Sequence, residues 1–209
     1  MGAGGDSLGP HLLDAGPALC LGGSSLLAEQ YAKFYIHNSK VAQAVSDEIF
    51  RKADQFVSPG DPKRIQGVVD AAKRAKSALH SVFVRPVTIT DEGQDLLDRV
   101  TARLVQLALA KGKTSGPTSH LGEAETIVVA KSTGWAMVTN DDDAHVVAGE
   151  AFCSHETFEH VVARMMVDHR VPGRMLFQEL TKLRTRKIDT GGTATSHLDL
   201  RALVGPQPG

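Results

Sequence analysis

Acidic side chains stand at both ends of one helix–strand unit in the second half of the chain. The segment from Gly122 to His145 reads GEAETIVVAKSTGWAMVTNDDDAH, so two glutamates open an apolar run of helical character and three aspartates follow an apolar run typical of a strand. A unit that only filled a core would not need acids at both entrances. Carboxylates gathered in one place repel one another unless a cation lies among them, and oxygen donors without Cys or His favour Mg²⁺ or Mn²⁺. Such ions promote displacement at phosphodiesters, which makes hydrolysis the chemistry to consider.

Two of the candidate carboxylates follow predicted strands. Asp14 comes directly after the apolar pair Leu12–Leu13, and Asp141 comes directly after the run AMVTN. Ligands of parallel sheets bind beyond the carboxyl ends of the strands, which is where both aspartates would lie. A single aspartate at a strand end is more often a helix cap or a turn residue, so only the pair points to a site.

Helical periodicity places the glutamates. Glu123 and Glu125 are about 200° apart around a helix, so they cannot face the same way. Glu123 aligns with Ile127 and Ala130 at the margin of the inward stripe, whereas Glu125 is expected in solvent as a favourable carboxylate of the first helical turn. Glu48, in AVSDEIFRK, falls near the edge of an apolar face, and taken alone it is equally well explained as an ordinary surface glutamate.

Short apolar strands alternate with amphipathic helices along the chain. Gly134 is expected to end the helix that begins near Gly122, and Asp91 to cap an earlier long helix. The strands are predicted at 12–13, 34–36, 81–90 and 135–139, and the helices at 24–34, 38–56, 63–80, 91–112, 122–133, from 141, at 154–170 and at 173–187. This alternation implies an α/β domain with a mainly parallel sheet.

The composition is that of an ordinary globular chain. Hydrophobic residues make up 42% of the 209 residues, and the formal net charge of -1 excludes a uniformly basic nucleic-acid wrapper. Cys20 and Cys153 fit small core residues in a reducing compartment. No apolar run approaches the roughly 20 residues that span a bilayer. We expect a cytoplasmic protein whose residues 1–10 form a flexible leader.

The acidic segments, taken in order, resemble those of the PIN-domain nucleases, a family that includes the toxin ribonucleases of bacterial toxin–antitoxin pairs. The segments are LLDAGPALCL with Asp14, AVSDEIFRKA with Glu48, GEAETIVVAKSTG with Glu123 and AMVTNDDDA with Asp141. The resemblance covers residues 12–166 and implies a PIN-like three-layer domain, with a central mainly parallel sheet flanked by helices. It further implies that these four acids are the catalytic, metal-holding residues of a Mg²⁺- or Mn²⁺-dependent endoribonuclease.

The residues and the resemblance together predict a domain arrangement. We expect a leader at 1–10, the PIN-like nuclease domain of the resemblance at 11–170, a C-terminal helical extension at 171–190 and an irregular tail at 191–209. The resemblance implies RNA as the substrate, while an antitoxin protein and a homodimer stay open, and the lack of a long apolar run predicts that no membrane is involved. An alternative also stays open, in which a catalytically silent PIN-like fold acts as a protein-interaction or RNA-binding module.

Some features depart from the family pattern. The helix at 63–80 and the tail after Arg186 have no counterpart in it, and NDDD leaves open whether Asp143 joins or replaces Asp141. Thr139 or Asn140 would bind the scissile phosphate or orient a metal ligand, although either could equally cap the next helix.

Two further polar patterns have weaker interpretations. In HETFEH the second histidine follows the first by five positions, which rotates it about 100° away from a shared zinc, so we expect a helix start capped by Ser154. Two basic faces would contact the RNA backbone or simply be solvated. Their residues are Lys63, Arg64, Lys73, Arg74 and Lys76, and Arg174, Lys182, Arg184, Arg186 and Lys187.

Overall fold

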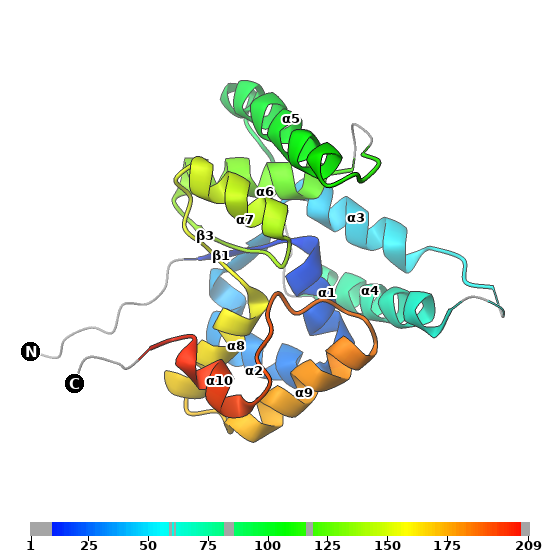
Figure 1. Cartoon of the computed structure of the whole chain (residues 1–209), viewed down its shortest axis with the longest axis vertical. Helices are drawn as coiled ribbons and strands as arrows, with labels where there is room; N and C mark the ends of the chain where they lie inside the picture. Colours follow the sequence, from blue (N-terminus) through cyan, green and yellow to red (C-terminus); the bar gives the residue numbers. More distant parts are fainter. Residues whose placement is uncertain (1–9, 59, 61, 82–85, 116–118, 206–209) are drawn as a thin grey trace, which may run out of the picture.

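A four-stranded sheet lies at the centre of the protein (Figure 1). The computed structural model describes residues 10–58, 60, 62–81, 86–115 and 119–205. The strands, in the spatial order β2-β1-β3-β4, pair in parallel throughout, which confirms the α/β prediction. They are β1 (His11–Leu13), β2 (Ser39–Val41), β3 (Ala136–Val138) and β4 (His155–Glu156).

Helices cover both faces of this sheet and give three layers (Figure 1). Successive strand residues point to opposite faces, so Leu12 and Met137 meet one helical layer while Leu13 and Val138 meet the other. The first layer contains α5 (Gln94–Ala110), α6 (Leu121–Thr133) and α7 (Asp142–Glu150). The other contains α1 (Ala15–Gly23), α2 (Ser25–Tyr35), α3 (Gln43–Ala53), α4 (Lys63–Ser81), α8 (Phe158–Val167), α9 (Gly173–Thr185) and α10 (His197–Ala202).

Two glycines shape the helices that carry the candidate acids. Gly134 ends α6 with φ 73°, a left-handed conformation that glycine adopts without strain, as the sequence predicts. A Cβ on Gly22 of α1 would lie 2.1 Å from the carbonyl oxygen of Ala71, so the absence of a side chain lets α4 pack directly on α1. Among the described residues, no helix is both long and apolar enough to cross a membrane.

Two predicted strands and the start of one predicted helix are corrected. The aromatic run at 34–36 is not a strand, because Tyr35 ends α2 with its ring buried and a 3-10 turn, η1 (Ile36–Asn38), follows before β2. The segment after Ser154 begins as the strand β4 rather than as a helix, and Thr157, whose hydroxyl accepts from the backbone of His160, caps α8. Of the strand predicted at 81–90, Ser81 ends α4, residues 82–85 lie outside the described residues, and Val87 alone forms an isolated parallel bridge with Ala42.

The tail and the start of α5 also differ from expectation. Asp91 does not cap α5, because a 3-10 turn, η2 (Asp91–Gly93), precedes that helix. The tail is not irregular throughout, since α10 packs on α8 and α9 and its Leu200 is fully buried. The predicted leader lies outside the described residues, apart from Pro10.

Candidate carboxylate site

The four predicted acids lie at the carboxyl-terminal edge of the sheet, on four different elements. Asp14 directly follows β1, and Asp141 lies three residues beyond the end of β3. Glu48 lies on α3, which leads away from β2, and Glu123 lies in the first turn of α6. Helix α3 contacts both α1 and α6, and α6 contacts α7, so the fold brings these segments together (Figure 1).

Two of the carboxylates approach the start of α6 at Gly122. A Cβ on Gly122 would lie 3.2 Å from Glu48 Oε2 and 4.0 Å from Asp14 Oδ1. Both oxygens are therefore within 4.0 Å of one point in space. Any larger residue at this position would enter the space between the two carboxylates, and glycine leaves it open.

Asp14 is buried and held by two hydrogen bonds. The backbone N–H of Ala15 donates to Oδ1 at 2.7 Å, and the hydroxyl of Thr139 donates to Oδ2 at 2.8 Å. Burial raises the pKa of Asp14 to about 6 against the lowering effect of these bonds, and the charges of Glu48 and Asp141 raise it further. The two hydrogen bonds thus fix the orientation of the Asp14 side chain, and the charges of the other acids affect its pKa.

Glu123 faces the same acids with less support. Burial raises the pKa of its carboxyl to about 8, and the charges of Asp14, Glu48 and Asp141 add to the effect. Its Oε2 is buried without a hydrogen-bond partner in the described part of the chain. The inward orientation predicted for Glu123 is confirmed. A proton or a bound cation would offset the cost of burying its unpartnered oxygen.

Asp141 and Asp143, which both follow β3, have different roles. Asp141 Oδ1 accepts from the backbone N–H groups of Asp143 at 2.8 Å and Ala144 at 3.0 Å, so Asp141 caps α7 as well as facing the other acids. Asp143 is buried, with its Oδ1 2.5 Å from Nζ of Lys111. The lysine balances the Asp143 charge, so Asp143 does not replace Asp141.

The remaining glutamates contact groups outside the cluster. Glu48 Oε1 lies 2.5 Å from Nζ of Lys52, one helical turn further along α3. The prediction that Glu125 is solvated is wrong. Its Oε2 accepts from the backbone N–H of Ala44 at 2.8 Å. This bond satisfies an N–H in the first turn of α3, because the N-cap residue Ala42 has no side chain that could accept it. This contact joins α6 to α3 beside the site.

Thr139 and Asn140 have different roles. The Thr139 hydroxyl binds Asp14, so it orients a candidate ligand. The Asn140 side chain donates through Nδ2 to the carbonyl of Asp189 at 2.7 Å and accepts through Oδ1 from the N–H of Phe158 at 3.1 Å. Asn140 therefore ties the end of β3 to the start of α8 and to the segment after α9.

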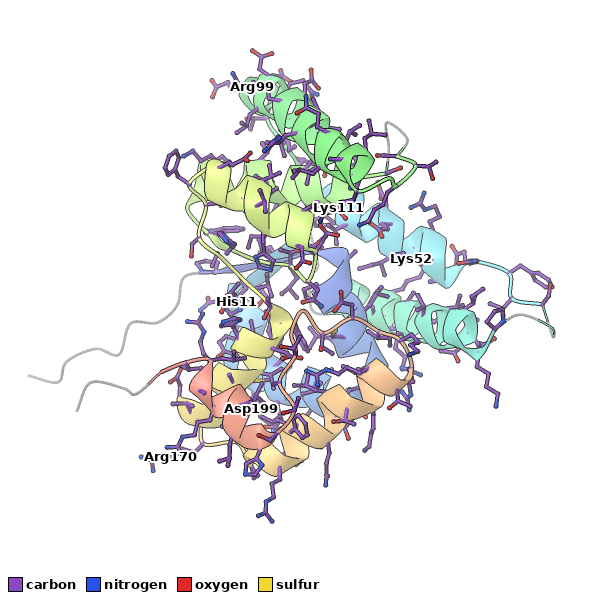
Figure 2. The ribbon with its side chains drawn as sticks, in the orientation of Figure 1. His11, Lys52, Arg99, Lys111, Arg170 and Asp199 are labelled. Carbon is purple, nitrogen blue, oxygen red and sulfur yellow. The ribbon has the colours of Figure 1, made fainter. Side chains whose placement is uncertain are left out.

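Basic side chains flank the carboxylates. Figure 2 shows Lys111 at the end of α5 and Lys52 on α3, both on the side of the molecule where α6 begins. A hollow of about 180 Å³ opens beside Glu48, and its lining includes Arg51, which has no ion pair with any described residue. Sequence reasoning missed these neighbours, although Lys52 could have been found from its spacing of four residues from Glu48.

The basic faces predicted from sequence are partly used within the fold. Arg74 Nε donates to the carbonyl of Gly22 at 2.5 Å, and Arg186 donates to the carbonyl of Gly23 at 3.0 Å. Arg184 pairs with the fully buried Glu159. These arginines hold elements together, so they are not free to bind RNA.

The donor set suits a hard divalent cation, although its arrangement is not a finished coordination shell. Within the described ranges, no group of three or more His, Cys, Asp or Glu side chains is arranged to hold a metal ion. The oxygen-only donors match the preference of Mg²⁺ and Mn²⁺, and the unpartnered Glu123 oxygen is an available ligand. The residues fit such an ion in chemistry, and the side chains would have to draw closer to bind it.

Comparison of the chain with protein-family models, with curated proteins and with solved structures gave no match. The sequence resemblance to PIN-domain nucleases therefore has no independent support from relatives, and what it implies about activity is a proposal.

Proposed function

We propose that the chain is a Mg²⁺- or Mn²⁺-dependent endoribonuclease of the PIN type, which hydrolyses RNA phosphodiester bonds. One observation carries the proposal. Glu123 places a carboxyl group with an unpartnered, buried oxygen in the field of three other acids at the carboxyl-terminal edge of a parallel sheet. Such an arrangement costs stability without a ligand, and a bound cation would offset that cost.

The roles of the residues follow from their contacts. Asp14, Glu48, Glu123 and Asp141 would hold the cation, and the Thr139 hydroxyl keeps Asp14 oriented. A divalent cation bound there would stabilise negative charge on a phosphodiester and lower the pKa of an attacking water. The proposal extends to a toxin ribonuclease with an antitoxin partner and a homodimeric form.

A basic neighbour would bind the substrate backbone. Arg51 is exposed, lines the hollow beside Glu48 and has no ion pair with any described residue. A cation in this position neutralises a phosphate close to the bond to be cut, which positions the RNA without reading its sequence.

Cleavage of a structured RNA in the presence of Mn²⁺ tests the proposal. We expect the wild type to cut and Asp14→Asn to lose cutting, because asparagine keeps the size of the side chain but removes a charged ligand. Asp142→Asn, in the same acidic run but exposed, is the matched control and should cut normally. Equal cleavage by the wild type and Asp14→Asn would show that the four acids are not the catalytic site.

A second candidate function is a catalytically silent binding module. It is favoured by the Glu48–Lys52 pair, which already satisfies one proposed ligand, and by the lack of a ready three-ligand group in the residues the structure covers. This module would bind RNA or a protein without cutting, and both Asp14→Asn and Asp141→Asn would leave binding unchanged. Binding assays run beside the cleavage assay separate the two functions.

A further inference from the structure

Two histidines, His145 on α7 and His155 on β4, form a pair. The ring centroids of His145 and His155 lie 5.1 Å apart, with the ring planes inclined at 55°. The Cε1 atom of His155 lies 3.6 Å from the position of a Cβ on Gly149, which is one helical turn beyond His145. The His155 ring therefore lies against α7 beside His145, within ordinary van der Waals distance of the Gly149 position.

Backbone carbonyls fix the position of the proton on each ring. His145 Nε2 lies 3.0 Å from the carbonyl oxygen of Thr139, and His155 Nδ1 lies 2.9 Å from the carbonyl oxygen of Cys153. A carbonyl oxygen only accepts, so these two nitrogens carry the hydrogens of the neutral rings. The opposite nitrogens, Nδ1 of His145 and Nε2 of His155, then carry lone pairs, and no hydrogen bond within the described residues uses them.

The pair is accessible from solvent at His155. That side chain is exposed, so its Nε2 is open to solvent. A metal ion binds histidine through such a ring-nitrogen lone pair.

We propose that His145 and His155 together bind one transition-metal ion of the Zn²⁺, Ni²⁺ or Cu²⁺ class. Two imidazoles bound at about 2.1 Å to one tetrahedral ion place their ring centroids roughly 5 Å apart, and the observed separation is 5.1 Å. Imidazole nitrogens prefer these ions to Mg²⁺, the reverse of the carboxylate site. An N–H on the far side of each ring, donated to a backbone carbonyl, is the usual outer support of a metal-bound histidine.

The coordination shell is completed by water. In the part of the chain that the structure describes, no third His, Cys, Asp or Glu joins the pair in a metal-binding group. Binding is therefore reversible and of moderate strength, and the ion stays open to exchange. This site does not depend on the proposed nuclease function.

Calorimetric titration with Zn²⁺ tests the site, with Mg²⁺ present in excess to occupy oxygen ligands. We expect one Zn²⁺ per chain, and a loss of affinity of about tenfold or more in both His145→Gln and His155→Gln. In His145→Gln the amide N–H can take the place of Nε2 and donate to the Thr139 carbonyl, and His155 is exposed, so we expect both variants to fold. His197→Gln on α10 is the matched control and should bind like the wild type.

The outcomes separate the alternatives. Unchanged Zn²⁺ affinity in His155→Gln, the exposed and structurally mild variant, overturns the proposal and makes the pair an ordinary ring contact. Loss of Zn²⁺ binding in Asp14→Asn with retention in both histidine variants also overturns it, because the ion then sits among the carboxylates. Loss in the histidine variants with retention in Asp14→Asn supports it, whether or not the protein cuts RNA.

Discussion

Replacing Glu123 with glutamine should stabilise the metal-free protein. The carboxyl has a pKa of about 8 in the folded chain, against 4.5 when unperturbed. At pH 8 this difference amounts to about 4 kcal/mol of lost folding free energy, at about 1.4 kcal/mol per pKa unit with the group half ionised. The figure is an upper limit, because Asp14 shares the repulsion. For a chain of this size it corresponds to a rise in melting temperature on the order of 10 °C at most.

The effect has a defined pH dependence. Because the folded-state pKa of Glu123 lies above the unfolded one, its contribution to stability is fully present below about pH 4.5 and is lost as the pH rises through about 8. Wild type and Glu123→Gln should therefore melt at similar temperatures near pH 4 and diverge steadily towards pH 8. Melting curves followed by circular dichroism across this range measure the divergence.

Metal should reduce this difference in stability between the wild type and Glu123→Gln. With Mg²⁺ or Mn²⁺ at about 100 times its dissociation constant, the wild type should gain about 2.7 kcal/mol, and Glu123→Gln should gain much less. Glu125→Gln is the matched control, since it changes the same group two residues away and can still accept from the N–H of Ala44. Should Glu123→Gln melt no higher than the wild type at pH 8, or should Mn²⁺ stabilise both equally, Glu123 would not be part of a charge-strained metal site.

Three further substitutions probe the fold around the site. His11→Gln should remove a loss of stability at acid pH. Burial lowers the pKa of His11 to about 4, so the free energy of unfolding of the wild type should fall by about 3 kcal/mol between pH 6.5 and pH 4. Urea unfolding at several pH values measures this loss. Gly22→Ala should destabilise by about 1–3 kcal/mol, because its methyl group would press on the Ala71 carbonyl, and an unchanged urea midpoint would contradict the close packing of α1 and α4. Leu200→Ala should cost about 2–5 kcal/mol, because α10 docks through this fully buried side chain; protease sensitivity of the C-terminal segment reports its release.

The parts of the site that follow from local periodicity could be predicted from sequence. Asp14 and Asp141 stand after apolar strands, and parallel strands bring their carboxyl ends to one edge, so their proximity follows from the strand pattern. The helical alignment of Glu123 with the buried Ile127 predicts the inward side on which its Oε2 lies. Contacts between segments far apart in the sequence could not be predicted. Glu125 caps α3, a helix some eighty residues earlier, and no local sequence pattern indicates that partner.

The fold shows the same division. Strand β4 has two residues, His155 and Glu156, and so short a polar strand carries no alternation of apolar side chains. The start of α10 has a sequence pattern typical of a capped helix, a serine at 196 followed three residues later by Asp199. In the structure the Ser196 hydroxyl accepts from the N–H of Asp199. A six-residue helix is too short for its apolar spacing to reveal it.

The hydrogen bond from Asn140 to the carbonyl of Asp189 has a consequence for how the chain can be shortened. The same carbonyl accepts from Sγ of Cys20 in α1, so the segment after α9 holds both α1 and the loop that carries Asp141. An expression boundary near residue 170 would remove this brace together with the buried Leu176, Leu180 and Leu183. A fragment ending there would keep every proposed ligand in its sequence and still lose the scaffolding that sets their positions.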